Sequence, residues 1–394
     1  MQYRGWTRRL WIAMAVVCAA LIPLWGCRDL NNREINRSDE NPSKKDTGIS
    51  VHISIKDDEE VLLVSPVVKE FFESDIDVHS YKLYAGFANG KLDYSVPLSV
   101  SYYVEGIPEG MSVSQAVLYI DENENSSDQQ VYTYEPGQTS LSVNFLKTNT
   151  IYFYKIEVTF SDGSTDVKTG SFRTANTPRI LSIDGIVNVR DIGGWETKQG
   201  TFIRQGMIYR GSELDGAVVS NFRLTAAGTR DMLDVLKIKT DMDLRHAGNF
   251  NGTHALGADV KHIYYGSPGY GQIFEDNYQE AVRNIFADLA DSENYPIYLH
   301  CTYGNDRTGT ICYLLEALLG ISDENLLKEY ALSIAHYGDK SFSMKSINDL
   351  EAQIQQRYPG KSTQEKVKKY LLSVGVTETE IQSIRDILLS DENG

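Results

Sequence analysis

The clearest chemical pattern in this sequence lies in the segment from His300 to Gly309, which reads HCTYGNDRTG. Five residues separate Cys301 from Arg307. A thiolate is a nucleophile that can attack phosphorus and form a covalent intermediate. A guanidinium can bind two phosphate oxygens at once. The spacing therefore predicts attack by Cys301 on a phosphate that Arg307 holds, through a phosphocysteine.

The flanking residues predict the elements that position this segment. Residues 296–299 (PIYL) are an apolar run typical of a buried strand, and residues 307–319 form an apolar helix that ends at Gly320. A loop between a strand and a helix N-terminus directs backbone N–H groups at an anion, and the helix dipole favours negative charge there. We expect a phosphate cradle whose positive field keeps Cys301 a thiolate. Its expected ligands are Thr302, Tyr303, Gly304, Asn305, Asp306 and Arg307.

The pattern His-Cys-x5-Arg-Thr-Gly resembles the signature of cysteine-dependent protein tyrosine and dual-specificity phosphatases. Residues 188–194 (NVRDIGG), 206–211 (GMIYRG) and 243–245 (DLR) resemble the bacterial tyrosine/serine phosphatase branch, which includes lipid- and phosphoinositide-active members. The resemblance spans most of residues 180–335. It implies hydrolysis of a phosphorylated protein or a small phosphomonoester, with neither a metal nor another cofactor. That branch usually carries Lys where this chain has Asn305, so one cation is missing from the expected pocket rim.

Two aspartates are candidates for the proton donor to the leaving group. Asp306 lies inside the loop, and Asp243 lies near the end of a predicted strand, where open α/β sheets place their sites. The resemblance implies both positions, although Asp243 could instead form an ion pair with an arginine of the fold. Thr308 is a candidate donor to the departing sulfur. Arg245 is a candidate substrate ligand or a structural residue.

The pattern of elements predicts two folded parts. Residues 176–394 alternate strands with helices, including a strand at 207–209, a helix from Thr225 to about 236 and a strand at 239–244. This alternation is typical of an α/β domain with a mostly parallel sheet flanked by helices. Thr377 and Glu380 predict a capping box before the last helix. We expect this α/β phosphatase domain to be preceded by an all-β sandwich.

Residues 50–175 alternate apolar and polar side chains with a period of two, and turn signals at 89–90, 108–110, 136–137 and 162–163 separate the runs. Short antiparallel strands with this spacing predict a sandwich. Residues 146–152 (LKTNTIY) resemble the tyrosine corner of fibronectin type III and immunoglobulin-like domains. The module could be a spacer or could bind a glycan or a protein, and the sequence leaves both open.

The N-terminus has the pattern of an export signal. Arg4, Arg8 and Arg9 precede an apolar run at residues 10–25, which is short for a membrane span. The run ends in LWGC, which resembles a bacterial lipobox and implies lipidation of Cys27. We therefore predict a signal peptide at 1–26, a polar tether at 27–49 and a protein anchored by lipid in the bacterial cell envelope, on its periplasmic or surface face.

Composition limits the remaining possibilities. The 394 residues include 38 Lys and Arg against 54 Asp and Glu, a formal net charge of −16, which argues against a nucleic-acid partner. A hydrophobic fraction of 41% is enough for folded cores. Two alternatives to a phosphatase stay open. One is a catalytically weak protein that binds a phosphate ligand, and the other is an adhesion or scaffold lipoprotein.

Overall fold

The computed structural model describes residues 48–79, 94–124, 129–249, 252, 254–338 and 343–392. The predicted signal peptide, the lipidation site Cys27, nearly all of the tether and the turn predicted at 89–90 lie outside these residues. Within the described ranges, no helix has both the length and the apolar character needed to cross a membrane.

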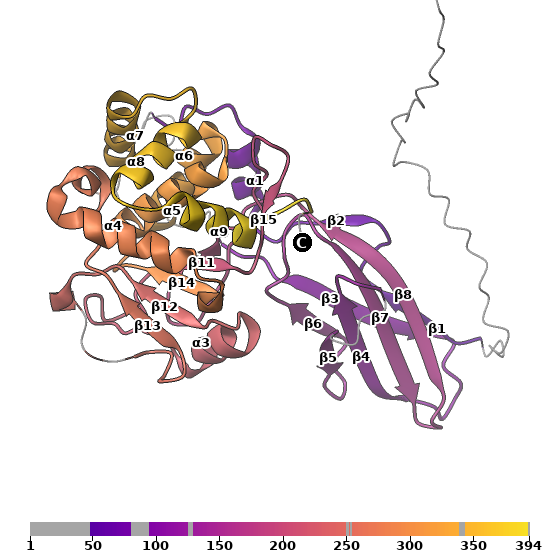
Figure 1. The fold of residues 1–394 in the computed structure, drawn as a ribbon. Coiled ribbons are helices and arrows are strands. Elements are labelled where there is room, and N and C mark those ends of the chain that lie inside the picture. Colours follow the sequence, from indigo (N-terminus) through magenta and orange to yellow (C-terminus); the bar gives the residue numbers. More distant parts are fainter. Residues whose placement is uncertain are drawn as a thin grey trace, which may run out of the picture. The chain divides into compact units, whose positions relative to one another are not determined.

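Residues 50–174 form two sheets that share one hydrophobic core (Figure 1). The first sheet consists of β1 (Ser50–Ile53), β3 (Leu98–Glu105) and β6 (Ser140–Val143), all antiparallel. The second has the order β2 (Glu59–Val61), β8 (Thr165–Thr174), β7 (Ile151–Phe160), β4 (Val113–Asp121) and β5 (Gln130–Tyr134), in which only the β2–β8 pair is parallel. Alternate residues of β7 are buried, as the period of two requires.

One helix interrupts this β-rich stretch. Helix α1 (Pro66–Glu73) starts with proline in its first turn and buries Val68 and Phe71. Phe71 packs in the core of the α/β part, and Val68 belongs to a small buried cluster with Ile180 and Leu332. The sequence predicted strands alone between 50 and 175, so this helix is an addition to the predicted pattern.

The α/β part contains a five-stranded sheet with the order β13-β12-β14-β11-β9. Four neighbouring strands are parallel and the edge strand β9 is antiparallel, so the predicted mostly parallel sheet is confirmed. The strands are β9 (Arg190–Asp191), β11 (Ile208–Gly211), β12 (Thr240–Asp243), β13 (Lys261–Tyr264) and β14 (Ile297–His300). A separate antiparallel pair joins β10 (Phe202–Ile203) to β15 (Leu389–Ser390).

Helices cover both faces of this sheet (Figure 1). Helix α3 (Ala226–Arg230) continues into a π-helical turn (Asp231–Val235), whose Met232 packs on one face. The other face carries α4 (Asp276–Leu289) and α5 (Asp306–Leu319), with α6 (Asp323–Tyr337), α7 (Lys345–Arg357), α8 (Thr363–Ser373) and α9 (Glu378–Leu388) beyond. Short 3-10 helices span Ala247–Asn249, Tyr270–Phe274 and Ser292–Asn294. All but the first two residues of α5 are buried.

The predicted helix ends are confirmed. Thr225 caps α3 by accepting a hydrogen bond from the Gly228 N–H, and Thr377 forms the predicted capping box with Glu380. Gly320 ends α5 in the left-handed region at φ 102°. The helix predicted from Thr225 to about 236 is α-helical only to Arg230 and π-helical beyond.

Candidate active site

The loop between β14 and α5 is held through its carbonyl groups. Each carbonyl from Cys301 to Gly304 accepts a hydrogen bond from a neighbouring segment. The donors are, in order, His300 Nδ1 (3.1 Å), the Glu213 N–H (3.0 Å), Asn188 Nδ2 (3.0 Å) and an Arg210 guanidinium nitrogen (2.6 Å). Because C=O and N–H of a trans peptide point in opposite directions, the loop turns its N–H groups to the other side. That side is therefore a cradle for an anion at the N-terminus of α5.

Gly304 allows the loop to pack closely against β11. Its φ is +68°, a region that residues with a Cβ rarely adopt. A Cβ at this position would lie 2.3 Å from the backbone oxygen of Gly211. Only glycine fits this approach without a backbone shift.

Arg307 and Thr308 present polar atoms that the protein leaves unbonded. Nη2 of Arg307 has only a long 3.4 Å contact with the Thr302 hydroxyl. Nη1 of Arg307 and the hydroxyl of Thr308 are buried and have no hydrogen-bond partner among the described residues. Leaving a buried charged donor unpaired costs several kcal/mol, on the order of a lost charged hydrogen bond. A bound anion would supply the acceptor that Arg307 lacks.

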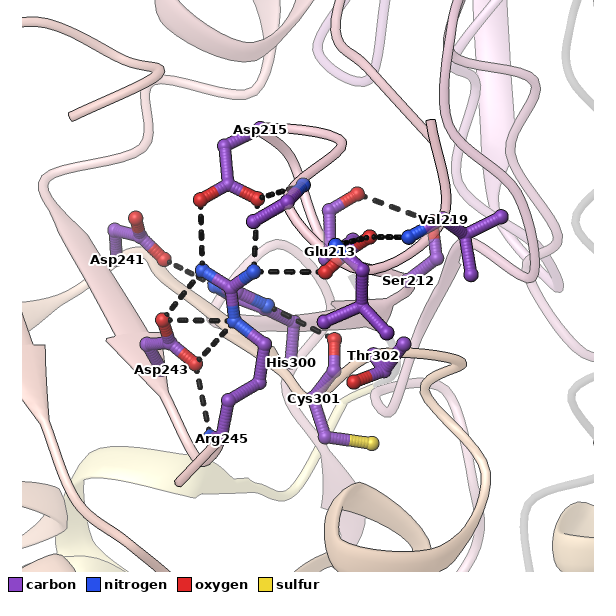
Figure 2. Close-up of polar contacts among 12 residues, drawn as sticks. Ser212, Glu213, Asp215, Val219, Asp241, Asp243, Arg245, His300, Cys301 and Thr302 are labelled. Carbon is purple, nitrogen blue, oxygen red and sulfur yellow. Dashed lines mark hydrogen bonds and ion pairs between the residues drawn. The ribbon is translucent and has the colours of Figure 1, made fainter. Parts of the chain in front are cut away.

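Cys301 is a free cysteine, 2% exposed, at the start of this loop. The neighbouring His300 makes an ion pair with Asp241 (Nε2–Oδ1 2.9 Å), and its Nδ1 faces the Cys301 carbonyl (Figure 2). An imidazole that faces a carbonyl and a carboxylate needs a proton on each nitrogen. Burial lowers the pKa of His300, but Asp243 and Asp241 outweigh this effect and raise the pKa to about 9. His300 is therefore a cation next to Cys301 at neutral pH.

Arg245 lies in a buried cluster of carboxylates behind the loop (Figure 2). Its three guanidinium nitrogens bond to Asp243, Asp215 and Glu213 at 2.7–3.0 Å. The side chain is 2% exposed. The expected role of Arg245 in binding substrate is therefore corrected, because carboxylates of the chain itself occupy every nitrogen that could hold a phosphate.

The two proton-donor candidates differ in their surroundings. Asp243 is fully buried, and both of its oxygens accept hydrogen bonds from Arg245. Burial raises the pKa of Asp243, but His300 and Arg245 lower it by more, so this carboxyl stays ionised at neutral pH. Asp243 is therefore the partner of an arginine of the fold, which was the alternative to its role as proton donor. Asp306 is half-buried in the first turn of α5, with no cationic partner in its described contacts, and is the better candidate.

A second buried ion cluster, which was not predicted from the sequence, supports the loop. Its members come from β9, β11 and α6. Arg190 and Arg210 both bind the Glu329 carboxylate (2.6 and 2.8 Å). Burial raises the pKa of Glu329, but the two arginines outweigh it and keep Glu329 ionised. Burial and the nearby Glu329 raise the pKa of Glu316, which is therefore neutral. Arg210, the one charged residue of the otherwise uncharged and buried strand β11, was the available signal.

A strand–loop–helix cradle with a cysteine at its start and, at its end, an arginine whose Nη1 bonds to no described residue defines the class of cysteine-dependent phosphatases. The sequence matches the Tyrosine phosphatase family over residues 181–390, which is more than half of the chain. The chain therefore belongs to this family.

Individual relatives are more distant. A provisionally named tyrosine-protein phosphatase of Cupriavidus necator is 26% identical over 178 residues, which are 38% of this chain and 61% of that protein. A tyrosine-protein phosphatase of Nostoc commune is 28% identical over 137 residues, which are 29% of this chain and 46% of the relative. The chain thus spans between about half and three fifths of the length of these relatives.

Among solved structures, the core catalytic domain of the PP-IP phosphatase Siw14 from S. cerevisiae, in complex with citrate, shares 15% identity. The match covers 45% of this chain and 91% of that domain, with a TM-score of 0.27. A similarity at this level says nothing about function.

Proposed function

We propose that this protein hydrolyses phosphomonoesters through a phosphocysteine intermediate and that its substrates are phosphorylated protein side chains. The observation that carries the proposal is the buried Nη1 of Arg307, which has no partner among the described residues and lies at the end of the loop that starts with Cys301. A phosphate in the cradle supplies the missing acceptor. Family membership supports the same reaction.

In the first step, the Cys301 thiolate attacks phosphorus and the bond from phosphorus to the ester oxygen breaks. Arg307 and the loop N–H groups hold the three phosphoryl oxygens and stabilise the charge that develops on them. Asp306 gives a proton to the leaving oxygen, so the product departs as a neutral alcohol or phenol.

In the second step, water attacks the phosphocysteine and its proton passes to the Asp306 carboxylate. The sulfur–phosphorus bond breaks and inorganic phosphate leaves. Thr308, whose buried hydroxyl has no acceptor or donor among the described residues, donates a hydrogen bond to the departing thiolate. These steps restore both Cys301 and Asp306.

Aromatic side chains around the loop support an aryl phosphate as substrate. Tyr303 is 37% exposed, and the rings of Phe222 and Tyr337 pack edge-on against it at 5.7 and 5.6 Å. An apolar wall of this kind favours a phenyl ring over a polyphosphorylated sugar. Asn305 adds no positive charge to the loop, which also argues against a multiply phosphorylated ligand. A phosphoinositide or inositol phosphate is the alternative substrate, and a catalytically weak phosphate-binding protein is the alternative without chemistry.

The proposal also covers the rest of the chain. Lipidation at Cys27 would anchor the protein in the bacterial cell envelope, with residues 27–49 as a tether between membrane and fold. The two sheets of residues 50–174 would form a fibronectin type III-like module. A hydrogen bond from the Lys147 N–H to the Tyr152 hydroxyl (2.8 Å) supports the expected tyrosine corner. A glycan or protein is the class of ligand that such a module would take.

The test compares phosphate release by residues 28–394 and by the Cys301→Ser variant, with reductant and a chelator present. The substrates are an aryl phosphate, a phosphotyrosine peptide, a phosphoserine peptide, a phosphoinositide and inositol hexakisphosphate. Cys312→Ser is the matched control, because Cys312 is fully buried in α5 and burial raises the pKa of its thiol to about 12. We expect turnover that only Cys301→Ser abolishes, highest on the phosphotyrosine peptide. Equal turnover by Cys301→Ser would refute the mechanism.

A further inference from the structure

Tyr270 takes no part in the reaction proposed for this site. Its φ is +52°, in the left-handed region that a tyrosine adopts only when its surroundings require it. The Tyr270 N–H donates to the hydroxyl of Thr310 in α5 (2.8 Å), and this hydroxyl donates to the Asp306 carbonyl (2.8 Å). The backbone of Tyr270 is thus fixed against the first turn of the helix that carries Asp306 and Arg307.

The side chain of Tyr270 reaches the same turn. Its hydroxyl forms hydrogen bonds with Oδ1 of Asp306 and with the hydroxyl of Tyr330. A tyrosine has one proton to donate, and an ionised carboxylate can only accept. While Asp306 is ionised, Tyr270 therefore donates to it and Tyr330 donates to Tyr270. Burial raises the pKa of Tyr270, and Tyr330 and Asp306 raise it further, so the hydroxyl keeps its proton throughout the working range of pH.

Asn305 adds a second donor to the same oxygen. Its Nδ2 donates to Oδ1 of Asp306 at 2.9 Å. An amide provides this hydrogen bond without a positive charge, so it orients the carboxyl without the Coulomb attraction by which a cation would favour the ionised form. Oδ1 thus receives two donors, one from the loop and one from the segment before α4.

We propose that Tyr270 and Asn305 are positioning residues that reserve Oδ1 of Asp306 as an acceptor, so that the proton given to the leaving group is carried by Oδ2. A proton on Oδ1 would meet the N–H of Asn305 head-on and would require the hydroxyls of Tyr270 and Tyr330 to reverse their hydrogen bonds, whereas Oδ2 accepts no hydrogen bond from a described residue. Oδ2 is therefore the oxygen that gives up the proton, and Oδ1 is held in place as an acceptor. The inference rests on the proposed function, with Asp306 as its acid.

The test separates orientation of the acid from general support of the fold. Tyr270→Phe removes the hydroxyl but keeps the ring and the N–H bond to Thr310. Tyr265→Phe is the matched control, because Tyr265 lies in the same segment and its hydroxyl donates to Asp288, a residue of α4. Both variants and Asn305→Ala are assayed on aryl phosphates whose leaving phenols range from strongly to weakly acidic. Leaving groups of low acidity need the proton and strongly acidic ones do not.

We expect Tyr270→Phe to lower kcat/KM by about 10-fold or more for phenyl phosphate and by less than about 3-fold for a dinitrophenyl ester, within the range of general acid catalysis. Asn305→Ala should show the same trend, and Tyr265→Phe none. In an Asp306→Asn background, Tyr270→Phe should have no further effect, because the group that it orients is gone. An equal loss across all leaving groups, or a further loss in the Asp306→Asn background, would overturn the proposal.

A second readout does not depend on turnover. The ¹³C shift of the Asp306 carboxyl should change in Tyr270→Phe and stay unchanged in Tyr265→Phe, while both variants still bind orthovanadate. If the unaltered protein shows no turnover, the proposed function fails, and the carboxyl shift alone then decides the positioning role. An unchanged Asp306 shift in a Tyr270→Phe variant that binds vanadate would refute it.

Discussion

The charge on His300 gives the fold a stability that depends on pH. Burial alone would lower the pKa of His300, but Asp243 and Asp241 raise it from 6.5 to about 9. Below pH 6.5 the ring is protonated in the folded and the unfolded chain alike, so the stabilisation is complete. Between pH 6.5 and 9 only the folded chain keeps the proton, and the free energy of unfolding falls as pH rises. Above pH 9 the contribution is lost.

The size of this effect follows from the shift. One pKa unit corresponds to about 1.36 kcal/mol, and the interval from 6.5 to about 9 is about 2.5 units, so the loss is about 3 kcal/mol. That amount is a large part of the stability of an ordinary domain, which is about 5–15 kcal/mol. The slope should be steepest between pH 7 and 8.5, where the two states differ by nearly one bound proton.

Urea unfolding at pH 6, 7.5 and 9.5 measures the effect, with His300→Gln as the comparison. A glutamine can donate to Asp241 but does not titrate, so the difference between the two proteins isolates the histidine. Nitrogen NMR of the imidazole reports its protonation directly and serves where the variant does not fold. A difference that stays constant from pH 6 to 9.5, or a neutral His300 ring in the NMR spectrum at pH 7.5, would refute the reasoning.

Three further substitutions test the support of the loop. Gly304→Ala places a Cβ 2.3 Å from the Gly211 carbonyl oxygen at a φ of +68°, so we expect a loss of about 1–3 kcal/mol in unfolding free energy and weaker vanadate binding, measured by urea titration and calorimetry. Arg210→Met removes one of the two cations on Glu329 and the donor to the Gly304 carbonyl, which should cost about 3–5 kcal/mol in the same titration. Glu316→Gln should leave stability at pH 7 within about 1 kcal/mol of the original or raise it, because Glu316 is already uncharged there. A large loss in Glu316→Gln would show that the carboxyl is ionised and paired.

The sequence was sufficient to predict the loop that carries the catalytic residues. Cys301, Arg307 and the elements on either side are encoded within some twenty consecutive residues, so their strand, turn and helix follow from local pattern. Gly320 and the pair of Thr377 and Glu380 were equally local signals, and the structure confirms all three.

The roles of Arg245 and Asp243 could not be predicted from local sequence. Whether they bind substrate or each other depends on Glu213 and Asp215, which lie about 30 residues earlier in the chain and reach Arg245 only through the pairing of β11 with β14 and of β14 with β12. Helix α1 was hidden for a similar reason. Its eight residues are too few for a clear helical period, and its stability comes from apolar contacts with distant residues of the α/β part.

Tyr270 is the clearest case of a residue whose role local sequence does not predict. Its position in a segment rich in glycine and tyrosine fits a substrate rim and a surface loop equally well. Its contacts with Asp306, Thr310 and Tyr330 join residues 36 to 60 positions apart in the chain, and no local pattern reports them.

Because four hydrogen bonds to carbonyl groups hold the loop, anion binding reports whether the segments that donate those bonds are folded. Their donors come from four places in the chain, namely Asn188, Arg210, Glu213 and His300. The cradle therefore exists only when these segments have assembled, and a partly unfolded chain has no site. By linkage, an anion that binds only the assembled form stabilises that form in proportion to RT ln(1 + [L]/Kd). Phosphate released by the reaction would thus slow amide hydrogen exchange in β9 and β11, strands that never touch it.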